Sequence, residues 1–235
     1  MQCKDVGGGG LYLDDNVLKY VDKEKYLGHF LGNTGDIIDF SNIARDIGVR
    51  ANTIIRNFGH LTSHAKIKLF NSCCLSLYGC ELWNLYSNKL KIMEKTWRIW
   101  CRRIIRINER THNKLIPGLM GTPSLREMVE LRMICFFTEG LQHKCDSIRN
   151  MFTNCMNENL YMAKNFNYLL FKYNLTIREC FIPKTKLRSL IANKHCNVPY
   201  ECNVLKELIM CRDNMMDCNL NIDEINCLIY SICTE

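Results

Sequence analysis

Two adjacent carboxylates near the start of the sequence are the first residues whose chemistry stands out. Asp14 and Asp15 directly follow Tyr12 and Leu13. Carboxylates bind Mg²⁺, and two-metal phosphoryl transfer needs them from two separate strands, because two ions must hold the attacking and the leaving oxygens. Eleven residues precede Tyr12, and Asp5 is the acidic one among them. We therefore expect Asp14-Asp15-Asn16 to form a turn, in which Asp and Asn are ordinary residues, rather than a catalytic pair.

The fifteen cysteines are a second possible source of chemistry. A loose group near the C-terminus comprises His195, Cys196, Cys202, Cys211 and Cys218. Structural zinc sites usually contain cysteine pairs separated by two to four residues, and the sequence has no C-x2-C pair. We predict no metal site and expect most thiols to pack as small apolar groups. An independent cysteine or zinc enzyme, for example one pairing Cys80 with His112, is the weakest alternative.

Positive charge is concentrated in one short stretch. The formal net charge is +7, and residues 86–114 contain nine basic and two acidic residues. Basic and acidic residues are equal in number on either side of this stretch. Such an uneven distribution predicts an anionic partner rather than a generally solubilising surface. The apolar content of 47% predicts a folded core and argues against global disorder.

The same stretch has the clearest helical periodicity in the sequence. Apolar residues recur at intervals of three and four, at Leu90, Met93, Trp97, Trp100, Ile104 and Ile107. This spacing predicts a packing face, so both tryptophans are expected in the core rather than stacked on bases. A second, cationic stripe lies on the same helix. The predicted phosphate-binding residues are Lys91, Lys95, Arg98, Arg102, Arg103 and Arg106.

The remaining elements are predicted from turn and capping signals. Short β-prone runs between residues 11 and 31 predict a small antiparallel hairpin or meander. A helix is expected from Asp39 or Ser41 to Gly59, and a second from Thr62 or Ser63 past Gly79 toward Trp83. Pro117 and Gly118 are expected to end the basic region, and Ser124 with Glu127 to begin another helix through a capping box. Residues 167–177 are predicted to be irregular, and a final helix is expected to start at Asn221.

The order of these motifs resembles a known family. Lys25-Tyr26-Leu27-Gly28-His29 precedes the first helix, and the stretch Leu69-Phe70 … Tyr78-Gly79 … Leu82-Trp83 follows the second helix start. Trp97-Arg98, Arg102-Arg103-Ile104-Ile105 and Thr111-His112 come next. Over about residues 11–145 this order resembles the region C-terminal to the polymerase palm in reverse transcriptases of non-LTR (LINE-type) retrotransposons.

The resemblance implies a mainly α fold, a helical thumb-like bundle preceded by a small antiparallel β-hairpin or meander. Residues 1–10 would be a flexible lead and 11–32 a primer-grip-like β-hairpin, with Tyr26, Leu27, Gly28 and His29 placing the primer end. Residues 33–145 would form a helical thumb-like domain with the basic helix, and 146–235 a C-terminal helical extension. The implied partner is an RNA–DNA or DNA duplex, bound without sequence specificity, with the upstream polymerase palm as a second partner.

Polymerase chemistry is not expected in this chain alone. Tyr12-Leu13-Asp14-Asp15 spells the family's Y-x-D-D motif, but Tyr26 follows Asp15 by only eleven residues, whereas several tens separate the corresponding family motifs. The hypothesis is therefore a C-terminal reverse-transcriptase fragment that lacks the catalytic aspartates, with Mg²⁺ required only by the intact polymerase. The alternative is a helical protein-interaction module, a retrotransposon relic that binds a partner or self-associates through the Leu90–Ile107 face. No secretory signal or membrane span is seen, so a nuclear or cytoplasmic location is expected.

Overall fold

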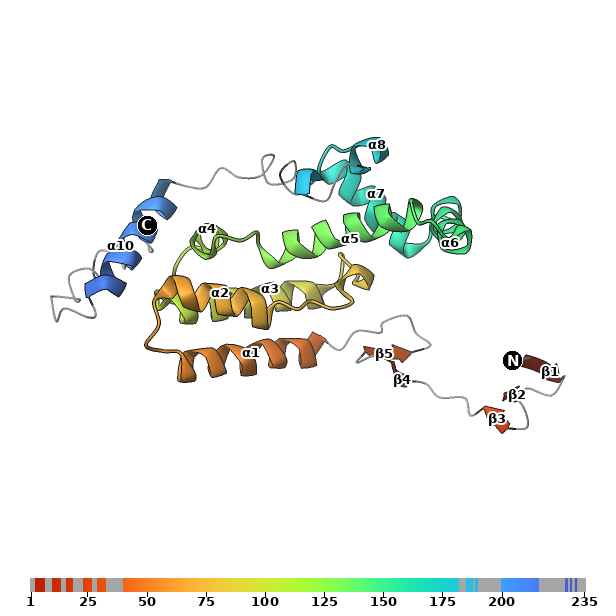
Figure 1. The fold of residues 1–235 in the computed structure, drawn as a ribbon, viewed down its shortest axis with the longest axis horizontal. Coiled ribbons are helices and arrows are strands. Elements are labelled where there is room, and N and C mark those ends of the chain that lie inside the picture. The colour runs from red at the N-terminus through yellow and green to blue at the C-terminus, as the bar shows by residue number, and fades with distance from the viewer. Residues whose placement is uncertain are drawn as a thin grey trace. The chain divides into compact units, whose positions relative to one another are not determined.

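The computed structural model is mainly helical, which confirms the predicted fold class at that level (Figure 1). It describes residues 3–6, 10–13, 16–18, 23–26, 29–32, 40–181, 185–187, 189, 200–215, 227, 229 and 231. The chain divides into two units, Met1–Asp39 and Phe40–Glu235. None of the described helices is both long enough and apolar enough to cross a membrane.

The described residues of the first unit form five short strands. Strands β1 (Cys3–Val6), β2 (Gly10–Leu13) and β3 (Asn16–Leu18) form an antiparallel sheet in that order. Strands β4 (Lys23–Tyr26) and β5 (His29–Gly32) pair antiparallel, with Tyr26 opposite His29. Leu13 is paired with Asn16, and Asp14 and Asp15 lie outside the described residues.

Three helices that pack on one another begin the second unit (Figure 1). They are α1 (Phe40–Asn57), α2 (Ser63–Cys74) and α3 (Asn88–Ile105). The predicted cap of α2 is confirmed, because the Thr62 side chain accepts a hydrogen bond from the backbone N–H of Ala65. The predicted continuation of this helix toward Trp83 is wrong. Helix α2 ends at Cys74, and Gly79, with φ of 73°, precedes the short 3-10 helix η1 (Cys80–Leu82).

The predicted packing face of α3 forms the centre of the core. Leu90, Met93 and Ile104 are fully buried, and Trp97 is 1% exposed. Trp100 is only partly buried and lies against α1 at Gly48, where a Cβ atom would be 3.1 Å from the Trp100 Cζ2 atom. Glycine at this position therefore allows the indole ring to approach the α1 backbone closely.

Helices α4 (Leu115–Met120) and α5 (Leu125–Leu141) follow α3. Pro117 and Gly118, expected to end the basic region, lie within α4, whose Leu115 and Ile116 are buried. The capping box of α5 is confirmed. The Ser124 N–H donates to Glu127 Oε2 at 2.7 Å, and the Glu127 N–H donates to Ser124 Oγ at 3.3 Å.

Helices from the C-terminal part of the chain pack on these elements. α6 (Asp146–Asn157), α7 (Tyr161–Lys172) and α8 (Ile177–Cys180) contact α5, and α10 (Tyr200–Met215) contacts α2 and α4. The prediction of irregular structure from residue 167 was wrong as far as Lys172, because Leu169 and Leu170 are buried in the core and stabilise α7. Most of the helix predicted from Asn221 lies outside the described residues.

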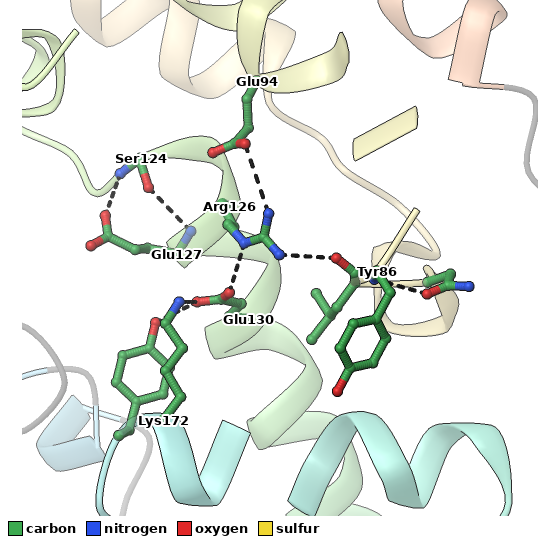
Figure 2. Close-up of polar contacts among 10 residues, drawn as sticks. Tyr86, Glu94, Ser124, Arg126, Glu127, Glu130 and Lys172 are labelled. Atoms are coloured by element: carbon green, nitrogen blue, oxygen red, sulfur yellow. Dashed lines mark hydrogen bonds and ion pairs between the residues drawn. The ribbon is translucent and has the colours of Figure 1, made fainter. Parts of the chain in front are cut away.

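A fully buried carboxylate, Glu130 of α5, joins α5 to α7 (Figure 2). Its Oε2 atom accepts hydrogen bonds from Lys172 Nζ and from the Tyr173 hydroxyl, both at 2.6 Å. Burial, and then the Glu130 carboxylate, raise the pKa of Tyr173 far above its ordinary value. The phenol therefore remains protonated and acts as the donor.

Arg126 extends this network toward α3 (Figure 2). Its Nε donates to Glu130 Oε1 at 3.1 Å, and its Nη2 donates to the carbonyl oxygen of Leu85 at 2.9 Å. Its Nη1 lies 3.9 Å from Glu94 Oε2 of α3. One guanidinium group thus holds together α5, the segment before α3 and α3 itself.

We predict that Glu130→Ala destabilises the protein strongly. The change leaves Arg126 and Lys172 without their shared carboxylate and removes the acceptor of Tyr173, and breaking a buried ion pair costs about 3–5 kcal/mol. Urea unfolding followed by circular dichroism measures the loss. Glu207→Ala, at an exposed position of α10, is the control and should change the unfolding free energy by less than about 0.5 kcal/mol. A similar loss in both variants would contradict the network's role.

A second close contact joins α5 and α6. A Cβ atom on Gly140 would lie 2.5 Å from ring atoms of the buried Phe152, so only glycine permits this approach. We predict that Gly140→Ala destabilises the protein by about 1–2 kcal/mol, because overpacking outweighs the better helix propensity of alanine. In a Phe152→Ala background the same change should be neutral or stabilising. A double-mutant cycle by urea unfolding tests this, and purely additive effects would refute the contact.

Candidate functional site

An open depression of about 730 Å³ lies between α3 and the segment that follows it. Six cationic side chains and one carboxylate, Glu109, are among the residues that line it. Helix α3 contributes Lys91, Lys95, Arg98, Ile99, Arg102 and Arg103, and the following segment contributes Ile107, Glu109, Arg110, Thr111, His112 and Asn113. Five of the six predicted phosphate-binding residues therefore lie around one concave surface.

Three of these cations are available to an external anion. Lys91, Lys95 and Arg98 succeed one another by one helical turn, so their side chains share a face of α3. None of the three forms an ion pair with a carboxylate of the described residues. Both lysines are exposed and Arg98 is half-buried. Their charge is therefore not neutralised by this part of the protein.

Two further arginines complete the cationic lining. The Arg103 guanidinium carbon lies 4.9 Å from the ring centroid of Trp100, a cation–π contact that orients the side chain. Arg110, which was not among the predicted binding residues, comes from the segment after α3. The charge excess of residues 86–114 already included Arg110, but helical periodicity could not place it beside the helix.

Arg102 has a different environment from its neighbours in the stripe. Its Nη2 donates to the carbonyl oxygen of Thr111 at 2.6 Å and to Asn113 Oδ1 at 2.7 Å. Thr111 is buried, and its hydroxyl donates to the carbonyl oxygen of Asn108 at 2.7 Å. Arg102 therefore fixes the segment after α3 against the helix.

Arg106 lies outside the depression. It is the C-cap of α3, with a left-handed φ of 53°, and its Nη2 donates to the carbonyl oxygen of Gly59 at 2.8 Å. This bond joins the end of α3 to the turn between α1 and α2. Helical periodicity predicted that Arg106 belongs to the cationic stripe. Helix α3 ends one residue earlier, at Ile105, so the prediction extended the helix too far.

The predicted primer-grip residues are in the other unit. Tyr26 ends β4 and His29 begins β5, and Leu27 and Gly28 lie outside the described residues. No group of three or more His, Cys, Asp or Glu side chains suited to a metal ion occurs in the described part of the chain. Of the loose group His195–Cys218, only the Cys211 side chain is described, and it is exposed.

The chemistry of the depression is that of anion binding. Guanidinium and ammonium groups donate charge-assisted hydrogen bonds to phosphate or carboxylate oxygens. The described lining contains no Trp, Tyr or Phe side chain on which a base could stack. The arrangement is therefore suited to a charged backbone rather than to base recognition, and Glu109 partly opposes the positive potential.

The Leu90–Ile107 face cannot act as the interaction surface that the protein-module alternative required. Leu90, Met93, Trp97 and Ile104 are buried within the second unit, and only Trp100 and Ile107 are partly exposed. The periodicity indicated an apolar face correctly, but this face packs against the chain's own helices.

The described thiols differ sharply in ionisation. Burial raises the pKa of Cys80 to about 12 and that of Cys74 to about 11. Exposed Cys145 has a lowered pKa, because the backbone of Ile148 and then of Ser147, at the start of α6, stabilises its thiolate. Cys80 is therefore unsuited to the nucleophile role considered for it with His112, which is exposed.

We predict that iodoacetamide at pH 8 modifies Cys145 well before Cys74 or Cys80. At this pH a thiol with a pKa of about 12 is ionised in only ~1 in 10⁴ molecules, and only the thiolate reacts. Raising the pH to 9 should accelerate Cys80 modification, but it should remain slower than that of Cys145. Peptide mass spectrometry over time measures this, with a urea-unfolded sample as the control. Equal native rates would contradict the burial of Cys80.

Comparison of the chain with protein families, curated proteins and solved structures finds no match. A functional proposal must therefore rest on the residues of the depression and on the order of the sequence motifs.

Proposed function

We propose that the depression on α3 grips the phosphate backbone of a nucleic acid without reading its sequence. The observation that supports this most strongly is the group of unneutralised cations, Lys91, Lys95 and Arg98, along one wall of a concave surface. Cations that contact phosphates release condensed counterions, which gives affinity that is insensitive to sequence and sensitive to salt. The lack of a Trp, Tyr or Phe ring in the described lining agrees with backbone contact.

We further propose that the chain is the C-terminal part of a LINE-type reverse transcriptase and that its ligand is a template–primer duplex. The order of the sequence motifs supports this proposal. In this reading, the paired strands β4 and β5 are a primer-grip-like hairpin and the helices from α1 onward are the thumb and its extension. The catalytic aspartates and their Mg²⁺ ions belong to the polymerase palm. The present chain binds the duplex and does not supply catalytic residues.

The charge of the depression sets the expected salt dependence. Each phosphate neutralised on a duplex contributes about −0.9 to the slope of log K against log salt concentration. Contacts from Lys91, Lys95, Arg98, Arg103 and Arg110 would together give a slope of about −4 to −5. Binding should therefore be measurable at low salt and weak at physiological salt.

We predict that Lys95→Glu/Arg98→Glu weakens duplex binding at least tenfold at low salt and makes the salt slope shallower by about two, because two phosphate contacts are lost. Fluorescence anisotropy with labelled 20-base-pair RNA–DNA and DNA duplexes measures both quantities. Two unrelated sequences of each duplex should lose affinity equally, because phosphate contacts carry no sequence information.

The matched control is Lys164→Glu, which reverses an exposed charge on α7 outside the lining of the depression. It should change the salt slope by less than about 0.5, since no phosphate contact is lost. An unchanged slope in Lys95→Glu/Arg98→Glu would refute the depression as the binding site. Equal losses in both variants would indicate a general charge effect instead.

A further inference from the structure

Arg102 lies in the middle of the cationic stripe but is engaged within the protein. Its Nη2 atom makes two short hydrogen bonds, to Thr111 and to Asn113, and both acceptors belong to the segment that forms the second wall of the depression. A nitrogen that already donates twice at 2.6 and 2.7 Å has no direction left for an external phosphate.

The segment held by Arg102 is ordered by hydrogen bonds of its own. The Arg110 N–H donates to Asn108 Oδ1 at 2.7 Å, and the Thr111 N–H donates to the Asn108 carbonyl oxygen at 3.1 Å. These bonds shape the turn from within and do not attach it to α3. Two side-chain bonds from Arg102 attach it to α3.

We propose that Arg102 is a positioning residue, which holds the Asn108–Asn113 segment so that Arg110 faces the anion bound by Lys91, Lys95 and Arg98. This inference rests on the proposed function and adds to it that the site has two walls, of which the second is held in place by Arg102. The guanidinium is required for its geometry, because the two N–H bonds of its planar Nη2 group point in fixed directions toward two acceptors, whereas an ammonium is a point charge. Its own positive charge contributes only secondarily.

The test removes one of the two bonds that attach the segment, without changing the charge. Asn113→Ala deletes one acceptor of Arg102 and leaves every cation in place. We expect the affinity for a 20-base-pair RNA–DNA duplex to fall about three- to tenfold and the salt slope to become shallower by about one, because the Arg110 contact is lost. Arg110→Gln should have the same effect, and Asn113→Ala/Arg110→Gln should bind no more weakly than Arg110→Gln alone.

Control variants and measurements distinguish a loss of affinity caused by lost positioning from one caused by unfolding or by lost charge. Asn154→Ala removes an exposed asparagine from α6 and should bind as the wild type does. Circular dichroism and the thermal midpoint should be unchanged in Asn113→Ala, since Asn113 is exposed. Arg102→Lys keeps the charge but loses the fork, and we expect it to lower the affinity about as much as Asn113→Ala does.

The outcomes distinguish this inference from the proposed function. A wild-type protein without salt-dependent duplex binding would overturn both. Normal wild-type binding with an unchanged affinity and slope in Asn113→Ala would overturn the positioning role alone. Additive losses from Asn113→Ala and Arg110→Gln would also overturn it, since they would show that the two residues act independently.

Discussion

The second unit depends on neutralising one buried carboxylate. Glu130 is completely excluded from solvent, and an isolated carboxylate in such a place would be prohibitively unstable. Its partners come from its own helix and from the end of α7, and Arg126 continues from it to Glu94 of α3 and the backbone of Leu85. Because these bonds need one mutual arrangement of α5, α7, α3 and the segment before α3, the carboxylate acts as a constraint on the assembly. Helix α3, which carries the cationic face, is oriented by this junction.

The sequence allowed α3 to be predicted well because its signals are local. Apolar spacing placed Leu90, Met93 and Trp97 in the core, and side-chain caps identified the starts of α2 and α5. Glu130 could not be recognised in the same way. An arginine four residues before a glutamate is common on exposed helices, and the partners that make this pair special lie 42 and 43 residues further along. Burial of an ionised group is a tertiary property without a local signature.

In the candidate site, too, local sequence patterns predicted some residues, and others depend on tertiary contacts that such patterns do not reveal. The charge excess and the helical period identified the cations on α3, but neither could show that the chain folds back after Ile105 and brings Arg110 alongside. Helix α7 was missed from Asn167 onward because asparagine is a poor helix former, whereas buried Phe166 and Leu169 stabilise it through packing. Tertiary contacts without a local sequence pattern thus determine both the second wall of the depression and helix α7.

Part of the cationic stripe also serves the helix itself. Arg102 and Arg103 lie in the last turn of α3, where positive side chains interact favourably with the negative end of the helix dipole. The bond from Arg106 to Gly59 then joins this end of α3 to the preceding pair of helices. The net charge of the stretch therefore overstates the number of groups directed at an external ligand.

Arg106 caps α3 in a left-handed conformation, and Arg102 donates two hydrogen bonds within the protein. These contacts divide the cationic stripe into positions that need a charge and positions that need a guanidinium group. If Lys91, Lys95 and Arg98 contact phosphates as proposed, only the presence of a charge matters there, so lysine and arginine should be interchangeable during evolutionary drift. At residues 102 and 106 the shape of the guanidinium group is part of the fold. The exchange of arginine for lysine, usually counted as conservative, should therefore be tolerated at the first three positions and selected against at the last two.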